Sequence, residues 1–386
     1  MPAPSRFPPP FADEHADLRE AVRRFVDTEL APRARAWEDD RWFPNSVFEQ
    51  LADLGWLGLK YPEEYGGEGG DHVHDAVLAE ELGRCGSGGL AAGIGAHIGI
   101  ATPPIWKFGT EEQKQRWLRP AVRAEKIAAL GITEPDAGSD VASIRTTARQ
   151  VDGGYVVNGS KTFITNGVRA DFVVTAVKTT GDGGHHGISF VVVEKGMDGF
   201  TVSRRLDKMG WHASDTAELA FADVFVPVEN LLGGENQGFY LIMANFQWER
   251  LLMSLGAVGA MQRLLETTLA YAKERSAFGR PIAGHQAIRH KIADMAVKLE
   301  RSRAVTYNAL RLFAAGHDAI REVTAAKLVT QRDCFEVADD AVQIHGGAGY
   351  MREYDVERAA RDARLGPIGG GTDEIMREIL AKQLGL

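Results

Sequence analysis

The sequence predicts an α+β protein in which a helical region, a β-rich region and a second helical region follow one another. Three observations predict this order. Apolar residues recur at helical spacing from about residue 15 to 123, β-branched runs dominate from about 126 to 232, and long helical patterns fill the chain from 238 onward. We therefore expect three domains, at 1–125, 126–235 and 236–386, with a β-barrel or sandwich in the middle and a four-helix bundle last.

The first region shows a one-face helical pattern at its start. Leu18, Val22, Phe25 and Leu30 repeat at that spacing, and Pro32 is expected to end the helix, because proline lacks the amide donor. Further helical runs are expected at 47–54, 75–82 and 111–122, and Gly-rich pieces at 61–67 and 85–89 are expected to be turns.

The middle region carries runs typical of strands. They lie at 155–157, 172–177, 188–193 and 216–226, and Gly-containing turns at 152–154 and 195–199 separate them. The last region predicts long helices near 238–275, 285–315 and 319–345, and then a shorter one that ends at Leu386.

Composition excludes several classes of protein. The 386 residues are 44% hydrophobic and 25% charged with a net charge of −9, which argues against nucleic acid or an anionic membrane as the partner. Cys85 and Cys334 lack CxxC spacing, so we expect two reduced thiols. The proline-rich residues 1–10 predict an extended tail rather than a signal peptide, and no apolar run has the length of a membrane span. We expect a cytoplasmic location.

Two segments point to chemistry. Phe246-Gln-Trp-Glu249-Arg-Leu-Leu places a carboxylate inside an apolar helical run, and Gly369-Gly370-Gly371-Thr372 supplies backbone that can lie against a flat ligand. A surface carboxylate is the ordinary interpretation of a helical Glu. The apolar neighbours of Glu249 favour a buried base instead.

Several motifs then resemble those of the acyl-CoA dehydrogenase family, in order and over nearly the whole chain. They are Ile132-Thr-Glu-Pro-Asp-Ala-Gly-Ser-Asp140, Gly159-Ser-Lys-Thr-Phe-Ile-Thr-Asn-Gly167, Arg275-Ser-Ala-Phe-Gly-Arg-Pro-Ile282 with Gln286, Gln343-Ile-His-Gly-Gly-Ala-Gly-Tyr350, and Gly371-Thr-Asp-Glu-Ile375. The resemblance implies the three-domain fold of that family and FAD as its cofactor.

The resemblance also implies which residues hold FAD. Thr133 would contact the isoalloxazine edge, Phe163 would pack on the ring where the family usually has Trp, and Thr165 would contact N5. Arg275 and Phe278 would reach the pyrophosphate and adenosine of a neighbouring subunit, which implies at least a dimer. The family commonly forms a dimer of dimers, so the resemblance implies a homotetramer of that kind. The full set implied for the cofactor is Ile132, Thr133, Gly138, Ser139, Phe163, Thr165, Arg275, Phe278, Gln286, Gln343, Gly346, Gly347, Thr372 and Glu374.

The expected base departs from the commonest family pattern. Many members carry Glu immediately before the final Gly-Thr pair, where this chain has Gly370, whereas the isovaleryl and long-chain enzymes carry it in a Glu-Arg-Leu sequence on the first bundle helix. Glu249-Arg250-Leu251 matches that branch. The resemblance therefore implies that Glu249 removes the α-proton of an acyl-CoA thioester while flavin N5 accepts the β-hydride. The residues implied for the substrate are Ser139, Tyr240, Arg250, Gly370 and Gly371.

Other interpretations stay open at this point. A flavin oxidase or monooxygenase of the same fold would not need Glu249, and a non-catalytic helical scaffold would not need the flavin residues. The acyl chain, and CoA as opposed to a carrier protein, are not fixed. An electron-transfer flavoprotein is the expected acceptor by resemblance. His185-His186 lacks further ligands, so we assign no metal, and a loop around 179–186 is expected near the CoA nucleotide.

Overall fold

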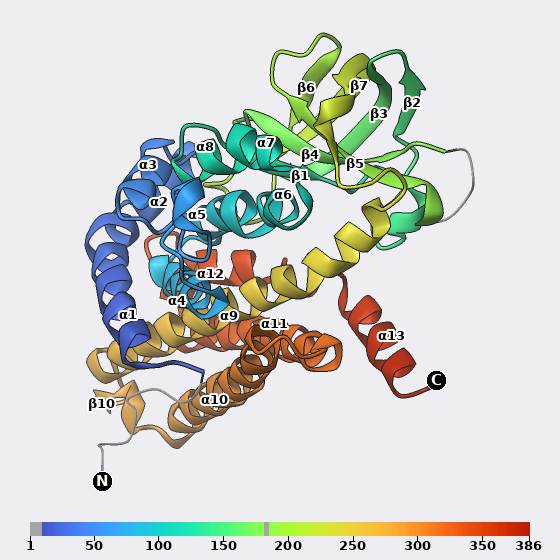
Figure 1. Ribbon diagram of the computed structural model, residues 1–386. Helices are drawn as coiled ribbons and strands as arrows, with labels where there is room; N and C mark the ends of the chain where they lie inside the picture. Colours follow the sequence, from blue (N-terminus) through green and yellow to red (C-terminus); the bar gives the residue numbers. More distant parts are fainter. Residues whose placement is uncertain (1–9, 181–184) are drawn as a thin grey trace.

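The computed structural model describes residues 10–180 and 185–386. The expected extended tail and part of the Gly-rich loop near 179–186 therefore lie outside the described residues. Figure 1 shows the N-terminal helices between the β-sheet region and a bundle of long helices. None of the helices in the described part of the chain combines the length and the apolar content needed to cross a bilayer.

The N-terminal region is helical throughout, including three short stretches of π-helix, η1, η4 and η5. Its elements are α1 (Asp13–Phe25), η1 (Val26–Leu30), α2 (Ala31–Asp40), α3 (Ser46–Asp53), η2 (Glu63–Tyr65), α4 (His72–Leu82), η3 (Gly83–Cys85), α5 (Gly88–Ile94), η4 (Gly95–Ala101), α6 (Pro103–Phe108), α7 (Glu111–Gln113), η5 (Lys114–Leu118) and α8 (Arg119–Val122).

Two expectations for this region were wrong. Pro32 does not end the first helix, because it falls in the first turn of α2, directly after the π-helical turn η1, where a missing amide donor leaves no helical bond unmade. The Gly-rich piece after Cys85 is not a turn alone. It enters helix α5, whose first turn is capped by the Ser87 hydroxyl, which accepts from the amide of Leu90.

The middle region forms one eight-stranded sheet in the order β6-β7-β3-β2-β4-β5-β8, with β1 pairing in parallel with β4. The elements are β1 (Ala128–Gly131), η6 (Val141–Ser143), β2 (Thr147–Val151), β3 (Gly154–Thr165), β4 (Phe172–Lys178), η7 (His185–Gly187), β5 (Ile188–Glu194), β6 (Phe200–Arg205), β7 (Thr216–Pro227), η8 (Val228–Asn230) and β8 (Leu231–Leu232).

The central strands β4 and β5 are buried on both faces. In β4, Phe172 and Val174 pack with the N-terminal helices, whereas Val173 and Val177 pack in a second core inside the sheet region. This alternation follows from the two-residue period of a strand, and it explains why the sequence there is a continuous apolar run. The helical region and the sheet are therefore joined by one hydrophobic core.

The C-terminal region contains three long helices and two short ones. The elements are α9 (Gly238–Glu274), β9 (Ser276–Ala277), β10 (Arg280–Pro281), η9 (Ile282–Gly284), α10 (Gln286–Ala314), α11 (Ile320–His345), η10 (Gly346–Tyr350), α12 (Val356–Ala363) and α13 (Asp373–Gln383). The expected fourth helix is thus divided in two by the Gly-containing segment 364–372. In Figure 1, α13 projects away from the other helices.

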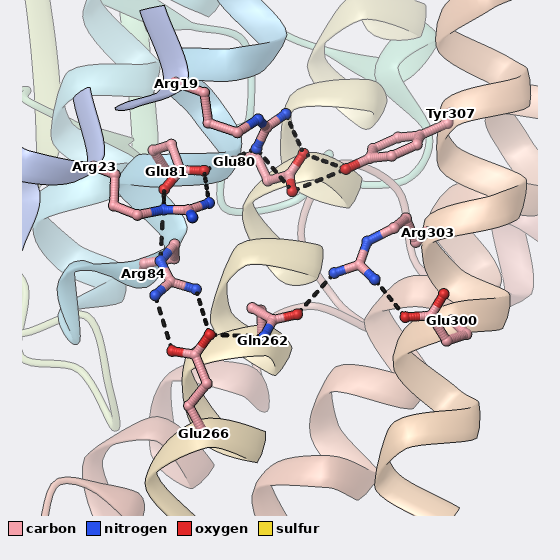
Figure 2. A network of polar contacts seen from close by, with 10 residues as sticks. All are labelled: Arg19, Arg23, Glu80, Glu81, Arg84, Gln262, Glu266, Glu300, Arg303 and Tyr307. Atoms are coloured by element: carbon pink, nitrogen blue, oxygen red, sulfur yellow. Dashed lines mark hydrogen bonds and ion pairs between the residues drawn. The ribbon is translucent and has the colours of Figure 1, made fainter. Parts of the chain in front are cut away.

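A buried polar network joins the N-terminal helices to the bundle (Figure 2). Arg19 of α1 donates to Glu81 at 2.8 Å and to Glu80 at 3.2 Å, and the Tyr307 hydroxyl of α10 donates to both oxygens of Glu80 at 2.8 and 2.9 Å. Arg84 reaches Glu266 of α9 at 2.9 Å. Because each buried carboxylate has several donors, the network fixes how α1 and α4 pack on the helix that carries Glu249.

Candidate active site

Glu249 is buried in the N-terminal third of α9, with 8% of its surface exposed. The interpretation as a surface carboxylate is therefore wrong. Burial raises the pKa of the Glu249 carboxyl to about 7, while the charge of Arg250 and a hydrogen bond from the Asn245 amide lower the pKa by less. A carboxyl with that pKa can accept a proton at neutral pH and release it again.

The Gly-rich loop before α13 lies against the same part of α9. Arg250 Nε donates to the carbonyl of Gly370 at 3.3 Å, and a Cβ built on Gly370 would lie 2.5 Å from the sulfur of Met253. Met253 is one helical turn beyond Glu249 and so shares its face. The loop that lacks a carboxylate and the helix that carries one are therefore neighbours in space.

Lys327 of α11 holds the other side of this loop. Its buried ammonium donates to the carbonyls of Gly366 at 2.9 Å and Gly371 at 2.5 Å, and burial lowers the pKa of Lys327 to about 8. Thr372 caps α13 by accepting from the amide of Ile375 at 3.3 Å. The amide of Gly370, by contrast, donates to no acceptor among the described residues. The loop thus offers a free backbone donor beside α9.

The first two expected flavin segments lie side by side. The amide of Thr162 donates to the carbonyl of Thr133 at 2.9 Å, and Lys161 Nζ donates to the carbonyl of Ile132 at 3.1 Å. Lys161 also pairs with buried Glu134 at 2.8 Å. The end of β1 and the end of β3 are therefore tied together at one rim of the sheet.

Phe163 is turned outward at this rim. The pairing of β3 with β7 shifts register between Lys161 and Ile164, and inside this bulge Phe163 has a φ of 61° and is 68% exposed. Ile164 is buried and Thr165 is half-buried. A bulge re-aims a side chain in this way. Nearby in the sequence, Gly138 and Ser139 are exposed, and nothing lies within 4 Å of a Cβ built on Gly138.

These features fit a flat cofactor such as FAD. An exposed aromatic ring at a strained φ is costly unless it has a partner, and the open space at Gly138 allows a ligand to approach the backbone closely. The hydroxyls of Thr133 and Thr165 are polar groups at the same rim.

Six further expected cofactor residues lie at the other end of α9. Phe278 is 96% exposed in the turn of the β9–β10 hairpin, and the ring of Tyr271 stacks on His345 at 4.0 Å, which brings the hairpin and the end of α11 together. Exposed residues gathered at this end are Arg275, Phe278, Gln286, Gln343, Gly346 and Gly347.

The length of α9 separates the two sets of residues. Gly238 at its start packs on Ile188 of β5, whereas Arg275 follows its last residue. A helix of 37 residues is about 55 Å long. Figure 1 shows β10 and the sheet at opposite ends of α9. The two sets therefore lie towards different ends of α9 within one chain.

Two other expected residues are exposed. Tyr240 is 65% exposed and meets the ring of Phe108 at 6.1 Å, on the opposite side of α9 from Glu249. Glu374 is exposed in the first turn of α13. Arg250, in contrast, is buried and directed at the Gly-rich loop.

Sequence reasoning did not single out Glu134, Lys327 or Asn245. All three are buried polar residues with specific partners. Glu134 lies inside a motif that the sequence analysis had identified, so its position could have marked it as a site residue. Lys327 and Asn245 lie in ordinary helical sequence, where spacing alone does not distinguish a buried polar residue from a solvated one.

One group of possible metal ligands occurs among the described residues. Atoms of Glu14, His15 and His74 lie within 4.8 Å of one another. The amide of Ala12 donates to Nδ1 of His15, so the proton of the neutral ring is on Nε2, which is then not free as a ligand atom. We assign no function to this group.

Comparisons with known proteins agree with this architecture. Family models described as acyl-CoA dehydrogenase N-terminal, middle and C-terminal domains match residues 12–125, 129–224 and 236–385. The chain is 41% identical to an acyl-CoA dehydrogenase of Bacillus subtilis (strain 168), covering 96% of this chain and 98% of that protein. It is 38% identical to the mitochondrial isovaleryl-CoA dehydrogenase of Solanum tuberosum, covering 97% and 91%.

Solved structures give the same result. A probable acyl-CoA dehydrogenase from Mycobacterium abscessus superimposes with a TM-score of 0.94 at 46% identity, covering 97% of this chain and 99% of the other. PigA with FAD and proline superimposes with a TM-score of 0.95 at 31% identity, covering 98% and 100%. The family uses FAD and its members are oxidoreductases. This chain belongs to the acyl-CoA dehydrogenase family.

Proposed function

We propose that this protein converts an acyl-CoA thioester to the trans-2-enoyl-CoA, with Glu249 as the base that removes the α-proton. The observation that carries the proposal is the buried Glu249 carboxyl, with a pKa of about 7, beside the Gly369–Gly371 loop. No carboxylate stands at position 370, so Glu249 is the carboxylate that α9 and this loop offer together.

The chain's own residues supply three parts of the reaction. Glu249 takes the α-proton as it leaves. The free amide of Gly370 donates to the thioester oxygen, where negative charge gathers as the proton leaves. Burial of Glu249 beside Trp248 and Leu251 excludes water from the base. Bound FAD would supply the oxidant that accepts the β-hydride.

We further propose that Thr133, Phe163, Thr165 and the segment Gly138–Ser139 hold the flavin in one chain, and that Arg275 and Phe278 hold it from a neighbour. The separation of these sets along α9 supports an oligomer, and we propose a dimer of dimers. An electron-transfer flavoprotein is the proposed acceptor of the electrons. Tyr240 and Arg250 are proposed to contact CoA.

The test is anaerobic bleaching of the bound flavin by short, long and branched acyl-CoAs, with wild type and Glu249→Gln. We expect one chain class to bleach the wild-type flavin, and the variant to bleach at least a hundredfold more slowly, about 3 kcal/mol in transition-state stabilisation. Flavin that is bound but is not bleached by any thioester would sink the proposal and favour an oxidase or monooxygenase. Purified protein without flavin would favour a scaffold.

A further inference from the structure

The π-helical segment η4 packs against α9 close to Glu249. A Cβ built on Gly99 would lie 2.4 Å from Leu252 of α9, so the two segments pack closely here. In a π-helix each carbonyl accepts from the amide five residues later, and such turns are common at functional sites. Pro103 lies five residues after Ile98 and Pro104 lies four residues after Ile100, and neither has an amide N–H to donate. Side-chain donors take their place.

Side chains outside η4 provide these donors. The Ile98 carbonyl accepts from the Thr102 hydroxyl at 2.8 Å, from Tyr61 at 3.2 Å and from Lys60 at 3.3 Å. The Ile100 carbonyl accepts from Asn245 Nδ2 at 3.0 Å. Asn245 is thus the residue by which α9 holds η4.

The same amide nitrogen of Asn245 also holds the base. Nδ2 donates to Glu249 Oε1 at 2.8 Å, and Asn245 is only 7% exposed. An amide nitrogen has two hydrogens, and here each has its own acceptor. Because the Ile100 carbonyl can only accept, the oxygen of the amide cannot occupy this place, so Ile100 fixes the orientation of Asn245.

We propose that Asn245 is a positioning residue for the proton transfer, which clamps Glu249 to η4 and favours the ionised form of the base. The inference rests on the proposed role of Glu249. A donor to a carboxylate stabilises the charged form, whereas burial alone would keep Glu249 protonated and unable to accept the α-proton. Asn245 therefore keeps a buried base competent at neutral pH without adding a charge to the acyl site.

The charged groups on the surrounding elements are directed elsewhere. Arg250, on α9 itself, donates to the Gly370 carbonyl, and Lys327 of α11 donates to Gly366 and Gly371. His97 of η4 donates a hydrogen bond from Nε2 to the carbonyl of Ala121 and accepts one at Nδ1 from the amide of Ala128.

Lys60, which also contacts η4, pairs with buried Asp75. Among the described residues, Asn245 is the direct hydrogen-bond donor to the Glu249 carboxyl.

The experiment compares Asn245→Leu and Asn245→Asp with wild type. The first removes the donor, and the second keeps the shape but places a second carboxyl beside Glu249. We measure the anaerobic rate of flavin reduction by the best acyl-CoA from pH 5.5 to 9.5. We also follow Glu249 protonation by infrared difference titration against Glu249→Gln, which needs no turnover.

For Asn245→Leu we expect the midpoint of both profiles to rise by about one pH unit, with flavin reduction about tenfold slower below pH 7 and recovering above pH 9. For Asn245→Asp we expect a larger rise, because like charges oppose ionisation. Gln247→Leu is the matched control, since residue 247 lies about 200° around α9 from Glu249 and its loss should leave the midpoint unchanged.

The outcomes separate the two proposals. Unchanged midpoints in both variants, at normal flavin content and melting temperature, would overturn the role of Asn245 while the base remains Glu249. A wild-type flavin that no thioester reduces would remove the proposed function, yet the infrared midpoint would still report whether Asn245 controls Glu249. A uniform loss of rate at every pH would indicate a packing role only and would also overturn the inference.

Discussion

Met253 lies directly against Gly370, so that a Cβ at position 370 would come within 2.5 Å of the methionine sulfur. Gly370 also has a φ of 64°, a conformation that side chains rarely adopt. The position that carries the base in many relatives is therefore closed to a side chain in two independent ways. The carboxylate on α9 and the glycine in the loop therefore depend on each other, because position 370 has no room for a carboxylate of its own.

The first prediction concerns Gly370→Ala. We expect a loss of about 2–4 kcal/mol in stability, from about 1–2 kcal/mol of backbone strain and a further overpacking term against Met253. Thermal unfolding of the purified protein measures the loss. Gly316→Ala is the matched control, because Gly316 has a φ of 75° with nothing within 4 Å of its Cβ, and should lose the strain term alone.

Met253→Ala in the Gly370→Ala background should restore part of the stability that Gly370→Ala loses beyond Gly316→Ala. A double variant as unstable as the sum of its single changes would show that Met253 and position 370 do not interact.

A second prediction concerns the pH dependence of stability. The folded-state pKa of Glu249 is raised to about 7 from 4.5, so the folded protein binds a proton that the unfolded chain releases between those values. Stability from this group is present below about pH 4.5 and is lost as pH rises to about 7. Glu249→Gln, which carries no charge, should therefore gain on the order of 3 kcal/mol over wild type at pH 8 and nothing at pH 4.5.

Chemical denaturation at both pH values measures this difference. Glu374→Gln is a control with an exposed carboxylate, and it should show no such gain. Equal stability of wild type and Glu249→Gln at pH 8 would mean that Glu249 is not desolvated as its burial indicates.

Lys327→Met is the basis of a third prediction. Removing the ammonium leaves the carbonyls of Gly366 and Gly371 without this donor, and each bond from a charged group contributes about 1.5–3 kcal/mol. We expect a loss of about 3–6 kcal/mol in stability and slower flavin reduction, because Gly370 is displaced. Lys298→Met, which removes a lysine paired with Asp340 on the bundle, should not slow flavin reduction at matched flavin content.

A fourth prediction uses the buried network of Figure 2. Glu81→Gln removes the carboxylate that Arg19 and Arg23 share at 2.8 Å, and should cost about 3–5 kcal/mol, because the two guanidinium groups lose a buried carboxylate that compensates their charge. Glu20→Gln, in an exposed pair with Arg24, should cost at most about 0.5 kcal/mol. Denaturation curves of both variants provide the comparison. Similar losses in the two would show that the network is solvent-screened.

The order of helices and strands was predictable wherever apolar periodicity was strong. The four predicted strands correspond to β3, β4, β5 and β7. Short edge elements such as β6 and β8 were not predicted, because few of their residues are buried or because they are only two residues long. Helix α5 was missed since glycine lowers helix propensity, and here tertiary packing outweighs that propensity.

The site was predictable only where residue type and motif agreed. The buried position of Glu249 follows from its apolar neighbours, and its proximity to Gly370 was expected from the resemblance. The bulge that turns Phe163 outward depends on the pairing of β3 with β7, which no local pattern reveals. The bond between Asn245 and Ile100 joins residues 145 positions apart, so it appears only in three dimensions.

The distance between the two ends of α9 has a genetic consequence. If each flavin is bound by two chains, a subunit defective at Thr165 and a subunit defective at Arg275 can complement each other. In a mixed pair, both lesions fall on one cofactor and the other cofactor sees only intact residues. Two inactive alleles expressed together would then regain flavin and activity, which neither produces alone.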